Sequence, residues 1–450
     1  MRNYQIKNNV FANIPQRISR LGELAENLWW SWNPQARMLF KMLDRQAWKE
    51  SGHNPDAMLK GLNSEVLQWA SMDRNYLRHY DLVLSQFDRD TRRRQAFYPE
   101  HPVAYLSAEY GLHPSLPFYA GGLGFLAGDH LKECSDMRQP LVGVGFMYPS
   151  GFLKQTISAE GWQESLTQTV DRESAAINQV LDERGERILI RVPHLEPEIR
   201  AAVWEVAVGR VSLFLIDTEI EENPSWIRDI AKQLYTSDQE QRLLQEATLG
   251  LGGYALLKEM GVEPSLLHLN EGHPAFALLE AISDLTREGK SFSQAREEVR
   301  QKSLFTTHTP VSAGHDVFPA ELVEKYLSPC RRALGLDRDF FLDLGRHPEQ
   351  PEGGFNMSLL ALRLAGGCNA VSRRHGEVTR GMWQSLWPDT PQEEIPIGHI
   401  TNGVHLPTWL DPKIRLLFNR YFGEGWIAEH DNPAIWEFLE EIPDHKLWRT

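Results

Sequence analysis

Residues 120–130 read AGGLGFLAGDH, a short glycine loop that runs directly into a predicted helix. The loop follows AYLSAEY (residues 104–110), which is typical of the end of a strand. Glycines let the backbone turn tightly and approach a ligand closely, and the start of a helix presents free N–H groups to an anion. This strand–loop–helix unit predicts an α/β fold with a phosphate site close to Glu109.

Two other interpretations of the glycine loop are open. The loop could do no more than pack the helix against the strand. Gly122, Gly124 and Ala127 also fit a loose dinucleotide-binding fingerprint. That fingerprint needs an acidic residue at the end of the next strand, but the predicted strand 141–148 ends without a carboxylate and the next acid is Glu160. Nicotinamide dinucleotide binding is therefore disfavoured.

Composition excludes several classes of protein. The chain has 450 residues, of which 42% are hydrophobic and 24% charged, and it carries a net charge of −14. This length allows two or three domains, and the negative charge disfavours nonspecific nucleic-acid binding. Cys134, Cys330 and Cys368 lie far apart, which predicts neither a disulfide framework nor a cysteine zinc site. The N-terminus has no apolar signal core and no apolar run could span a bilayer, so we expect a cytoplasmic protein.

The pattern of predicted helices and strands divides the chain into two regions. Residues 1–95 predict a helical N-terminal cap without a clear strand, with a new helix starting at Pro34, and residues 96–102 form a plausible junction. The region 96–450 alternates strands and helices, which is typical of a parallel sheet covered on both faces. We expect strands at 103–107, 141–148, 188–195, 201–208, 211–217, 265–269, 303–307, 368–372 and 397–401, with a hairpin at residues 209–210. We expect helices at 121–138, 237–260, 273–289, 291–302, 319–328, 356–366, 374–386 and 412–421, and helix broken by Pro443 within 434–450.

Polar clusters follow the predicted strands, where ligands gather in parallel sheets. They comprise Glu109 and the stretches 270–273 (NEGH), 306–309 (TTHT), 372–375 (SRRH) and 401–403 (TNG). Each stretch also has a purely structural interpretation. The stretch NEGH (270–273) could do no more than cap a helix, and residues 402–403 could do no more than form a turn.

Histidines in these clusters suggest little metal chemistry. A lone histidine such as His308 is more often a satisfied structural group than a catalyst. His308 and His315 lack the spacing of a zinc motif and no third ligand is specified, so we predict no metal site.

Taken together, the segments resemble the α-glucan phosphorylases, the family of glycogen, starch and maltodextrin phosphorylases. The matching segments are YLSAEY (105–110), AGGLG (120–124), GWQ (161–163), NEGHPA (270–275 after Leu269), THT (307–309) and TNGV (401–404). The segment NLWWSWNP (27–34) is similar to the helical lead-in of the bacterial and archaeal branch. The resemblance covers essentially the whole chain and corresponds to the N-terminal half of the family.

The resemblance implies two facing Rossmann-like domains, the GT-B arrangement, with the active site between them and this chain providing the first domain. It implies reversible phosphorolysis of terminal α-1,4-glucosyl units to glucose 1-phosphate with retained configuration. The implied cofactor is pyridoxal phosphate, whose phosphate exchanges a proton with the substrate phosphate. An oxocarbenium-like transition state makes nearby dipoles important.

The resemblance implies a role for each residue that occupies a functional position of the family's motifs. His308 matches the histidine of the glucosyl subsite, whose main-chain carbonyl supports positive charge at the sugar, and the glycine pair Gly121 and Gly122 matches the loop facing the phosphates. The resemblance implies substrate contacts by Asn402, Asn270, Glu271, His273, Leu123 and Thr309, with Glu271 where the family usually has Asp. It implies cofactor contacts by Gly122, Glu109 and Tyr110, although the family's usual tyrosine two positions after the acid is replaced here by Gly111.

The family's Schiff-base lysine and phosphate-binding basic residues belong to a C-terminal motif that is not found after Asn402. We therefore expect this chain alone to be inactive and to need a C-terminal half or a second subunit. Two alternatives are open: a glycogen- or starch-synthase-type glucosyltransferase, disfavoured because Tyr119 replaces the lysine before the glycine loop, and a noncatalytic glucan-binding subunit.

Overall fold

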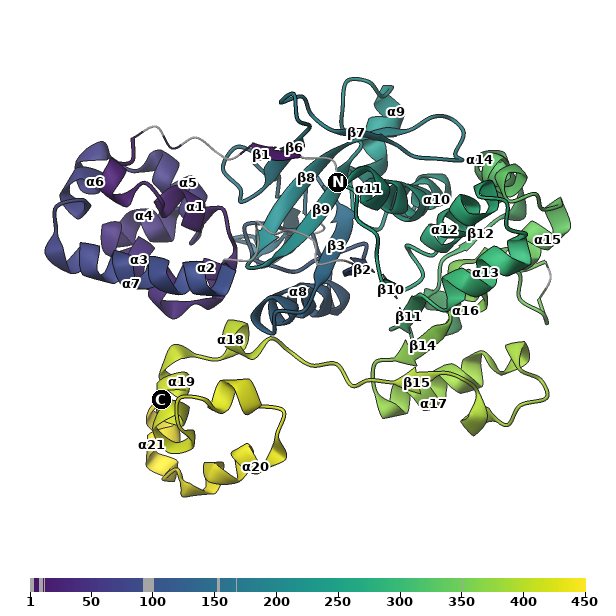
Figure 1. Cartoon of the computed structure of the whole chain (residues 1–450). Helices are drawn as coiled ribbons and strands as arrows, with labels where there is room; N and C mark the ends of the chain where they lie inside the picture. Colours follow the sequence, from purple (N-terminus) through teal and green to yellow (C-terminus); the bar gives the residue numbers. More distant parts are fainter. Residues whose placement is uncertain are drawn as a thin grey trace.

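The computed structural model describes residues 4–7, 11, 13–91, 101–151, 154–166, 168–350 and 352–450. It has a mixed α/β architecture built on one large sheet, with helical bodies at either end of the chain (Figure 1). The strands in sheet order are β1 (Gln5–Lys7), β6 (Asn178–Leu181), β8 (Arg200–Val208), β9 (Val211–Asp217), β3 (Leu141–Phe146), β2 (Val103–Leu106), β10 (Leu266–Asn270), β11 (Ser303–Thr307), β14 (Gly367–Ala370) and β15 (Gly398–His399), with β7 (Leu189–Arg191) beside β8.

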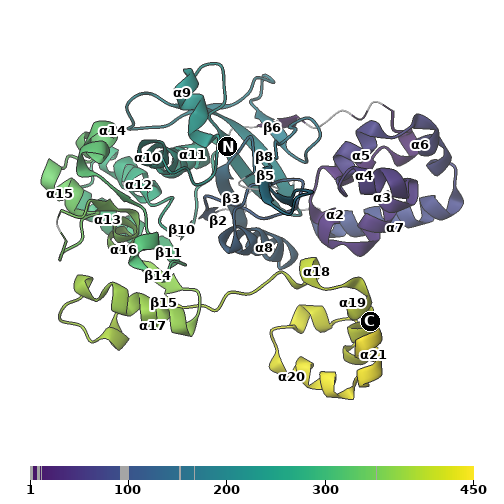
Figure 2. The same cartoon turned by 180° about the vertical axis from the view of Figure 1, so that it is seen from behind.

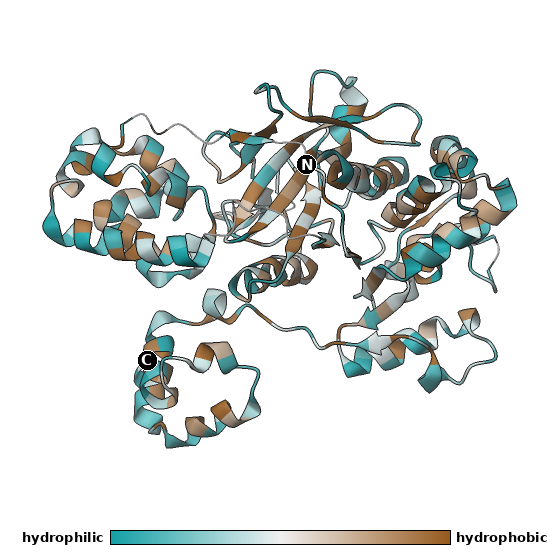
Figure 3. Cartoon of the chain, in the orientation of Figure 1, coloured by the Kyte–Doolittle hydropathy of each residue, from teal (hydrophilic) through white to brown (hydrophobic). Residues whose placement is uncertain are grey.

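The half of the sheet from β9 to β15 is parallel, and the half from β1 to β8 is antiparallel. Every residue of β3 and β9 is buried, as expected of strands covered on both faces. The central strands are accordingly mostly apolar (Figure 3). The connections β2–β3 and β9–β10 run in opposite directions along the sheet, so right-handed crossovers place their helices on opposite faces.

Helix α8 (Gly122–Asp136) makes the first of these connections and packs on β3, β8 and β9. The second contains α10 (Gln239–Ala247), a π-helical segment (Thr248–Gly252) and α11 (Gly253–Glu259). The remaining helices of this region are α9 (Ser225–Arg228), α12 (Phe276–Arg287), α13 (Phe292–Arg300), α14 (Ala320–Ala333), α15 (Arg338–Asp343), α16 (Met357–Leu364) and α17 (Arg373–Met382).

The N-terminal helices form a body beside the sheet, seen from both sides in Figures 1 and 2. Asn33 caps α3 by accepting hydrogen bonds from the N–H groups of residues 35 and 36, which confirms the helix predicted at Pro34. The helices are α1 (Leu21–Ala25), α2 (Trp29–Trp32), α3 (Pro34–Leu43), α4 (Arg45–Glu50), α5 (Pro55–Gly61), α6 (Ser64–Ala70) and α7 (Arg74–Thr91).

The C-terminal helices have a small core of their own around Phe418, Trp426 and Ile442. They are α18 (Leu406–Trp409), α19 (Pro412–Phe422), α20 (Pro433–Trp436) and α21 (Asp444–Arg449), and α18 lies against α2. The predicted break at Pro443 is confirmed, because this proline precedes α21. Trp436 packs on the small core, whereas Trp448 is 90% exposed.

The predicted parallel sheet and the hairpin at residues 209–210 are confirmed. The prediction that residues 1–95 contain no strand is wrong, because β1 pairs with β6. The hairpin of β4 (Lys154–Ile157) and β5 (Gln163–Leu166) and the strand β6 were not predicted, and the strands expected at 188–195 and 397–401 are shorter. The helix expected at 237–260 contains the π segment. Most of the junction expected at 96–102 lies outside the described residues. Within the described residues, no helix has the length and hydropathy needed to cross a bilayer.

Candidate active site

The glycine loop is held in place by the carboxylate of Glu109. Its Oε2 accepts hydrogen bonds from the N–H groups of Ala120 (2.8 Å) and Gly121 (3.2 Å), and its Oε1 accepts one from the Tyr235 hydroxyl (2.5 Å). Glu109 lies three residues after the end of β2 and is buried. This acid therefore fixes the point at which the chain leaves the sheet and α8 begins.

The first turn of α8 faces open space. A Cβ atom built on Gly121 or Gly122 would have no neighbour within 4 Å, whereas one on Gly124 would lie 2.5 Å from the Tyr119 Cβ. Gly124 is thus needed for packing, but the pair before it is not. The unpaired N–H groups of a first helical turn and the positive end of the helix dipole favour an anion here.

The ends of β10 and β11 are joined through the side chains of Asn270 and Glu271. The Asn270 Oδ1 lies 2.6 Å from the His308 Nε2, and the Asn270 Nδ2 donates to the Ser107 hydroxyl (3.0 Å). One oxygen of Glu271 accepts from the N–H of His308 (2.7 Å) and from both the N–H and the hydroxyl of Thr309 (3.1 Å each). Glu271 has φ 68° although it is not glycine, a strained conformation that is concentrated at functional sites.

Burial keeps the imidazoles of this cluster neutral at pH 7. It lowers the pKa of His308 to about 4, with a further lowering by His375. Because the Asn270 Oδ1 accepts, the neutral His308 ring carries its proton on Nε2, and Nδ1 is the acceptor. Burial also lowers the pKa of His273 to about 3. These rings can donate and accept hydrogen bonds without bringing charge.

A buried ion-pair cluster lies next to His273. Its Nε2 is 3.5 Å from Asp316, which also pairs with Arg242 (3.0 Å), and Arg242 lies 3.1 Å from Glu246. Burial raises the pKa of Glu246. Burial opposes ionisation of Asp316 as well, but Arg242 and His273 outweigh it and lower the pKa of Asp316.

Glu246, His273 and Asp316 have ligand atoms within 4.8 Å of one another, a spacing that could hold a metal ion. Arg242 lies among them and packs over the Tyr235 ring at 4.8 Å. The guanidinium already supplies the positive charge that the two carboxylates require, so the cluster is explained without a metal. The sequence-based expectation of no metal site stays a prediction.

The chain has extensive similarity to known proteins. Residues 14–116 match a family described as a protein of unknown function (DUF3417). The chain is 42% identical over 430 residues to the glycogen phosphorylase of Aquifex aeolicus, covering 95% of this chain and 61% of that relative. It is 41% identical over 451 residues to the maltodextrin phosphorylase of Thermococcus litoralis, and 37% identical over 464 residues to the glycogen phosphorylase of Mycobacterium tuberculosis, covering 53% of each relative. The chain is homologous to glycogen and maltodextrin phosphorylases. It spans 53–61% of the length of these phosphorylases.

The structure brings together some of the residues that the phosphorylase resemblance singled out. Asn270, Glu271, His308 and Thr309 form one hydrogen-bonded group, and His273 lies beside it. Gly121, Gly122 and Leu123 lie together at the start of α8. Asn402 is at the far edge of this region: its side chain is exposed and its N–H donates to the Val371 carbonyl (3.0 Å).

Tyr110 is placed in the core. It is 1% exposed, and its hydroxyl donates to the carbonyls of Tyr105 (2.9 Å) and Val144 (3.0 Å). Its role toward a phosphorylase cofactor stays a prediction, and the geometry offers no contact that supports it.

Sequence reasoning missed four residues of the site. Ser107 joins Asn270 to the Glu109 main chain, Tyr235 holds the Glu109 carboxylate, and Arg242 and Asp316 form the ion pair behind His273. The i, i+4 spacing of Arg242 and Glu246 on one predicted helix was a usable signal. Ser107 lies inside the YLSAEY segment (105–110) but had no role assigned to it, and Tyr235 and Asp316 lie in segments without a motif.

Proposed function

We propose that this chain carries the glucan- and phosphate-facing part of an α-glucan phosphorylase. The reaction is reversible phosphorolysis of terminal α-1,4-glucosyl units, giving glucose 1-phosphate with retained configuration. The observation that carries the proposal is the meeting of two features in a homologue of glycogen phosphorylases: an open helix start after β2, and the hydrogen-bonded group of Asn270, Glu271 and His308 after β10 and β11.

The start of α8 fits a phosphate group. Side chains are lacking at Gly121 and Gly122, where a Cβ would stand in open space, so an anion could closely approach those N–H groups at the start of α8 that do not already donate to Glu109. These glycines, ordered by Glu109, would face both the substrate phosphate and the phosphate of pyridoxal phosphate, the cofactor implied by the family resemblance. When bound, that cofactor would supply a phosphate able to exchange a proton with the substrate phosphate.

Glu271 orients the backbone at His308. Its carboxylate accepts the N–H groups of both residue 308 and residue 309. In a trans peptide the C=O points opposite to the N–H, so the His308 carbonyl points away from Glu271. We infer that this fixed dipole faces the glucosyl ring and stabilises the positive charge that develops there. The neutral imidazole, positioned by Asn270, would hydrogen-bond a sugar hydroxyl.

The glucan side would be lined by His273, Thr309, Leu123 and, at the far edge, Asn402. We further propose the GT-B arrangement, with a second Rossmann-like domain facing these residues. Because the chain spans only 53–61% of its relatives, that domain would correspond to their remaining length and would be supplied as a C-terminal half or a second subunit. The three free cysteines suit a cytoplasmic enzyme.

Donor preference tests this proposal against its alternatives. The chain is assayed alone and supplemented with the part of the Aquifex aeolicus relative that lies outside the aligned region, with pyridoxal phosphate present. We expect the supplemented chain to extend maltoheptaose from glucose 1-phosphate but not from UDP-glucose or ADP-glucose, and the chain alone to be inactive. Extension from a nucleotide sugar would support a synthase-type enzyme instead, and glucan binding without extension from any donor would support a binding subunit.

A further inference from the structure

An extended segment at residues 400–404 joins the last strand of the sheet to α18. Figures 1 and 2 show this segment running from β15 to the beginning of α18, which lies beside α8. All five of its residues are exposed. We call residues 400–404 the strap, because this segment is anchored to the rest of the protein toward both of its ends.

The first anchor of the strap is the end of β14. The N–H of Asn402 donates to the carbonyl of Val371, which follows this strand (3.0 Å). Strands β14 and β11 are paired as far as Ala370 and Thr307, so Val371 and His308 occupy the next position on neighbouring strands. The strap therefore starts at the same edge of the sheet as the hydrogen-bonded group around His308.

The second anchor is the clasp, a set of hydrogen bonds between α8 and α18 formed by Asp129, Lys132, Asp136, His405, Thr408 and Trp409. The Asp129 Oδ2 accepts from the His405 N–H (3.0 Å) and from the Trp409 indole N–H (2.6 Å). Asp129 is 4% exposed and His405 is fully buried. Because His405 directly follows the strap, its N–H fixes the end of the strap to the middle of α8.

Residue spacing explains how α8 forms its side of the clasp. Positions 129, 132 and 136 recur every three or four residues and so lie on one face of the helix. The Lys132 ammonium donates to the Thr408 hydroxyl (3.3 Å), and the His405 Nε2 lies 3.1 Å from the Asp136 Oδ2. The Trp32 ring of α2 packs edge-on against the His405 ring, with 5.5 Å between centroids. Every hydrogen-bonding atom of the His405 ring is thus engaged.

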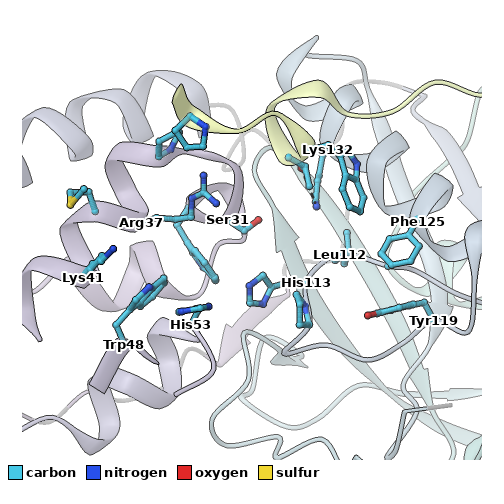
Figure 4. A pocket seen from close by; sticks show the side chains of 18 residues that line it. Ser31, Arg37, Lys41, Trp48, His53, Leu112, His113, Tyr119, Phe125 and Lys132 are labelled. Atoms are coloured by element: carbon cyan, nitrogen blue, oxygen red, sulfur yellow. Dashed lines mark hydrogen bonds between the residues drawn. The ribbon is translucent and has the colours of Figure 1, made fainter. Parts of the chain in front are cut away.

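The interface between α8 and α18 is not closely packed throughout. A cavity of about 670 Å³ lies beside the clasp, between α3, α8 and α18, and Lys132 lies in its wall next to the yellow ribbon of the α18 region (Figure 4). Trp409 also lines this cavity and contacts the Phe125 ring at 5.6 Å between centroids. The hydrogen bonds of the clasp therefore carry much of the attachment of α18 to α8.

We propose that Asp129 and His405 are positioning residues, which hold the strap so that the Asn402 side chain faces the glucosyl units bound at the strand-end site. Only Gly403 and Val404 separate the two anchors, and within the described residues neither of them makes a hydrogen bond. Each residue of an extended chain spans at most about 3.6 Å, so fixing His405 leaves Asn402 little freedom. This inference rests on the proposed function, in which Asn402 contacts the glucan.

Hydrogen exchange of the 450-residue chain tests the hold of the clasp without any ligand. Asp129→Ala removes the acceptor of both hydrogen bonds, so the amides of residues 402–405 should exchange at least about tenfold faster than in the parent chain. Asp129→Asn keeps an oxygen that can accept both bonds, and the Asp129 Oδ1 accepts none from the described residues. The exchange of Asp129→Asn should therefore stay close to that of the parent chain.

Asn27→Ala is the matched control. Asn27 is 1% exposed, and its side chain donates to the Gly209 carbonyl (3.0 Å) and accepts from the Gly209 N–H (2.9 Å). This variant also removes two buried hydrogen bonds between distant parts of the chain, but outside the clasp. Exchange at residues 402–405 and glucan binding should both be unchanged in it.

Isothermal titration calorimetry of the 450-residue chain with maltoheptaose tests the consequence for the glucan. Asp129→Ala and Asn402→Ala should each raise the Kd about tenfold, the loss of one hydrogen bond, at unchanged stoichiometry. A partly unfolded variant would instead lose stoichiometry and keep the parent Kd. Because Asp129 acts through Asn402, the double variant should bind within about twofold of Asn402→Ala alone. Asp129→Asn should bind much as the parent chain does.

Three results would overturn the inference. Unchanged exchange at residues 402–405 in Asp129→Ala would show that the clasp does not hold the strap. Losses that multiply in the double variant would show that Asp129 does not act through Asn402, and an equal loss in Asn27→Ala would show a general effect on stability. Failure of the proposed function has a different signature, a parent chain that binds no maltoheptaose, and the positioning role would then fail with it.

Discussion

Replacing Gly122 by alanine should separate the function of the glycine loop from its packing. A Cβ at this position meets no heavy atom within 4 Å. Alanine is also the better helix former, by up to about 1 kcal/mol in a helix interior. We therefore expect Gly122→Ala to fold with a free energy of unfolding within about 1 kcal/mol of the parent value.

The same methyl group would stand where a phosphate approaches the first turn of α8. Losing one charge-assisted hydrogen bond to that phosphate would cost about 1.5–3 kcal/mol. The KM for phosphate should then rise about tenfold to a hundredfold.

Gly128→Ala is the matched control, because it introduces the same group two turns further along α8. There the Cβ would lie 2.2 Å from the Gly111 carbonyl oxygen and 2.7 Å from its carbon. The helix would have to move by about 1 Å, and overpacking of this kind costs about 1–3 kcal/mol. Gly128→Ala should therefore lower the free energy of unfolding, which Gly122→Ala should not.

Urea unfolding of both variants gives the free energy of unfolding. Initial rates of glucose 1-phosphate formation by the supplemented preparation, measured at varied phosphate concentration, give the KM for phosphate. The reasoning is refuted if Gly122→Ala retains the parent KM for phosphate, since the open turn would then not face that group. It is also refuted if Gly122→Ala is as destabilised as Gly128→Ala.

Three further predictions concern single side chains. Asn270→Ala should lower kcat/KM for maltodextrin at least tenfold, whereas Asn270→Asp keeps an acceptor for His308 and should lose less; equal losses in steady-state assays would argue against this hydrogen bond. Arg242→Met leaves the side chains of Asp316 and Glu246 without their buried cation, so urea unfolding should show a free energy of unfolding lower by about 3–5 kcal/mol. A decrease below about 1 kcal/mol would contradict the importance of this ion pair. Burial raises the pKa of Glu280 to about 8 from 4.5, so its contribution to stability is present below about pH 4.5 and is lost as the pH rises to about 8; Glu280→Gln should gain stability relative to the parent over that interval, and parallel pH–stability curves would disprove the shift.

The sequence was most informative where neighbouring residues decide the structure. The hydrophobic runs of β3 and β9 and the glycine-rich start of α8 are local patterns, and each formed the element expected. The carboxyl ends of parallel strands must lie at one edge of a sheet, so the strand pattern alone placed Asn270 and His308 at the same edge.

What the sequence did not predict depends on distant partners. The strand β1 is three residues long and polar, and it exists because it pairs with β6 more than 170 positions later. The Arg242–Asp316 ion pair and the Tyr235–Glu109 hydrogen bond likewise join segments that share no motif. The cavity between α3, α8 and α18 likewise forms only when three separate parts of the chain are placed together.

Phosphorus-31 NMR of the supplemented chain, given maltoheptaose, inorganic phosphate and pyridoxal phosphate, tests the central claim most directly. The account predicts that the phosphate resonance falls while that of α-glucose 1-phosphate grows, that glucan and phosphate are both required, and that His308→Ala greatly slows the conversion. If the parent preparation binds maltoheptaose yet forms no phosphate ester, or forms the β-anomer, the assignment of phosphorolysis with retention to this site is contradicted.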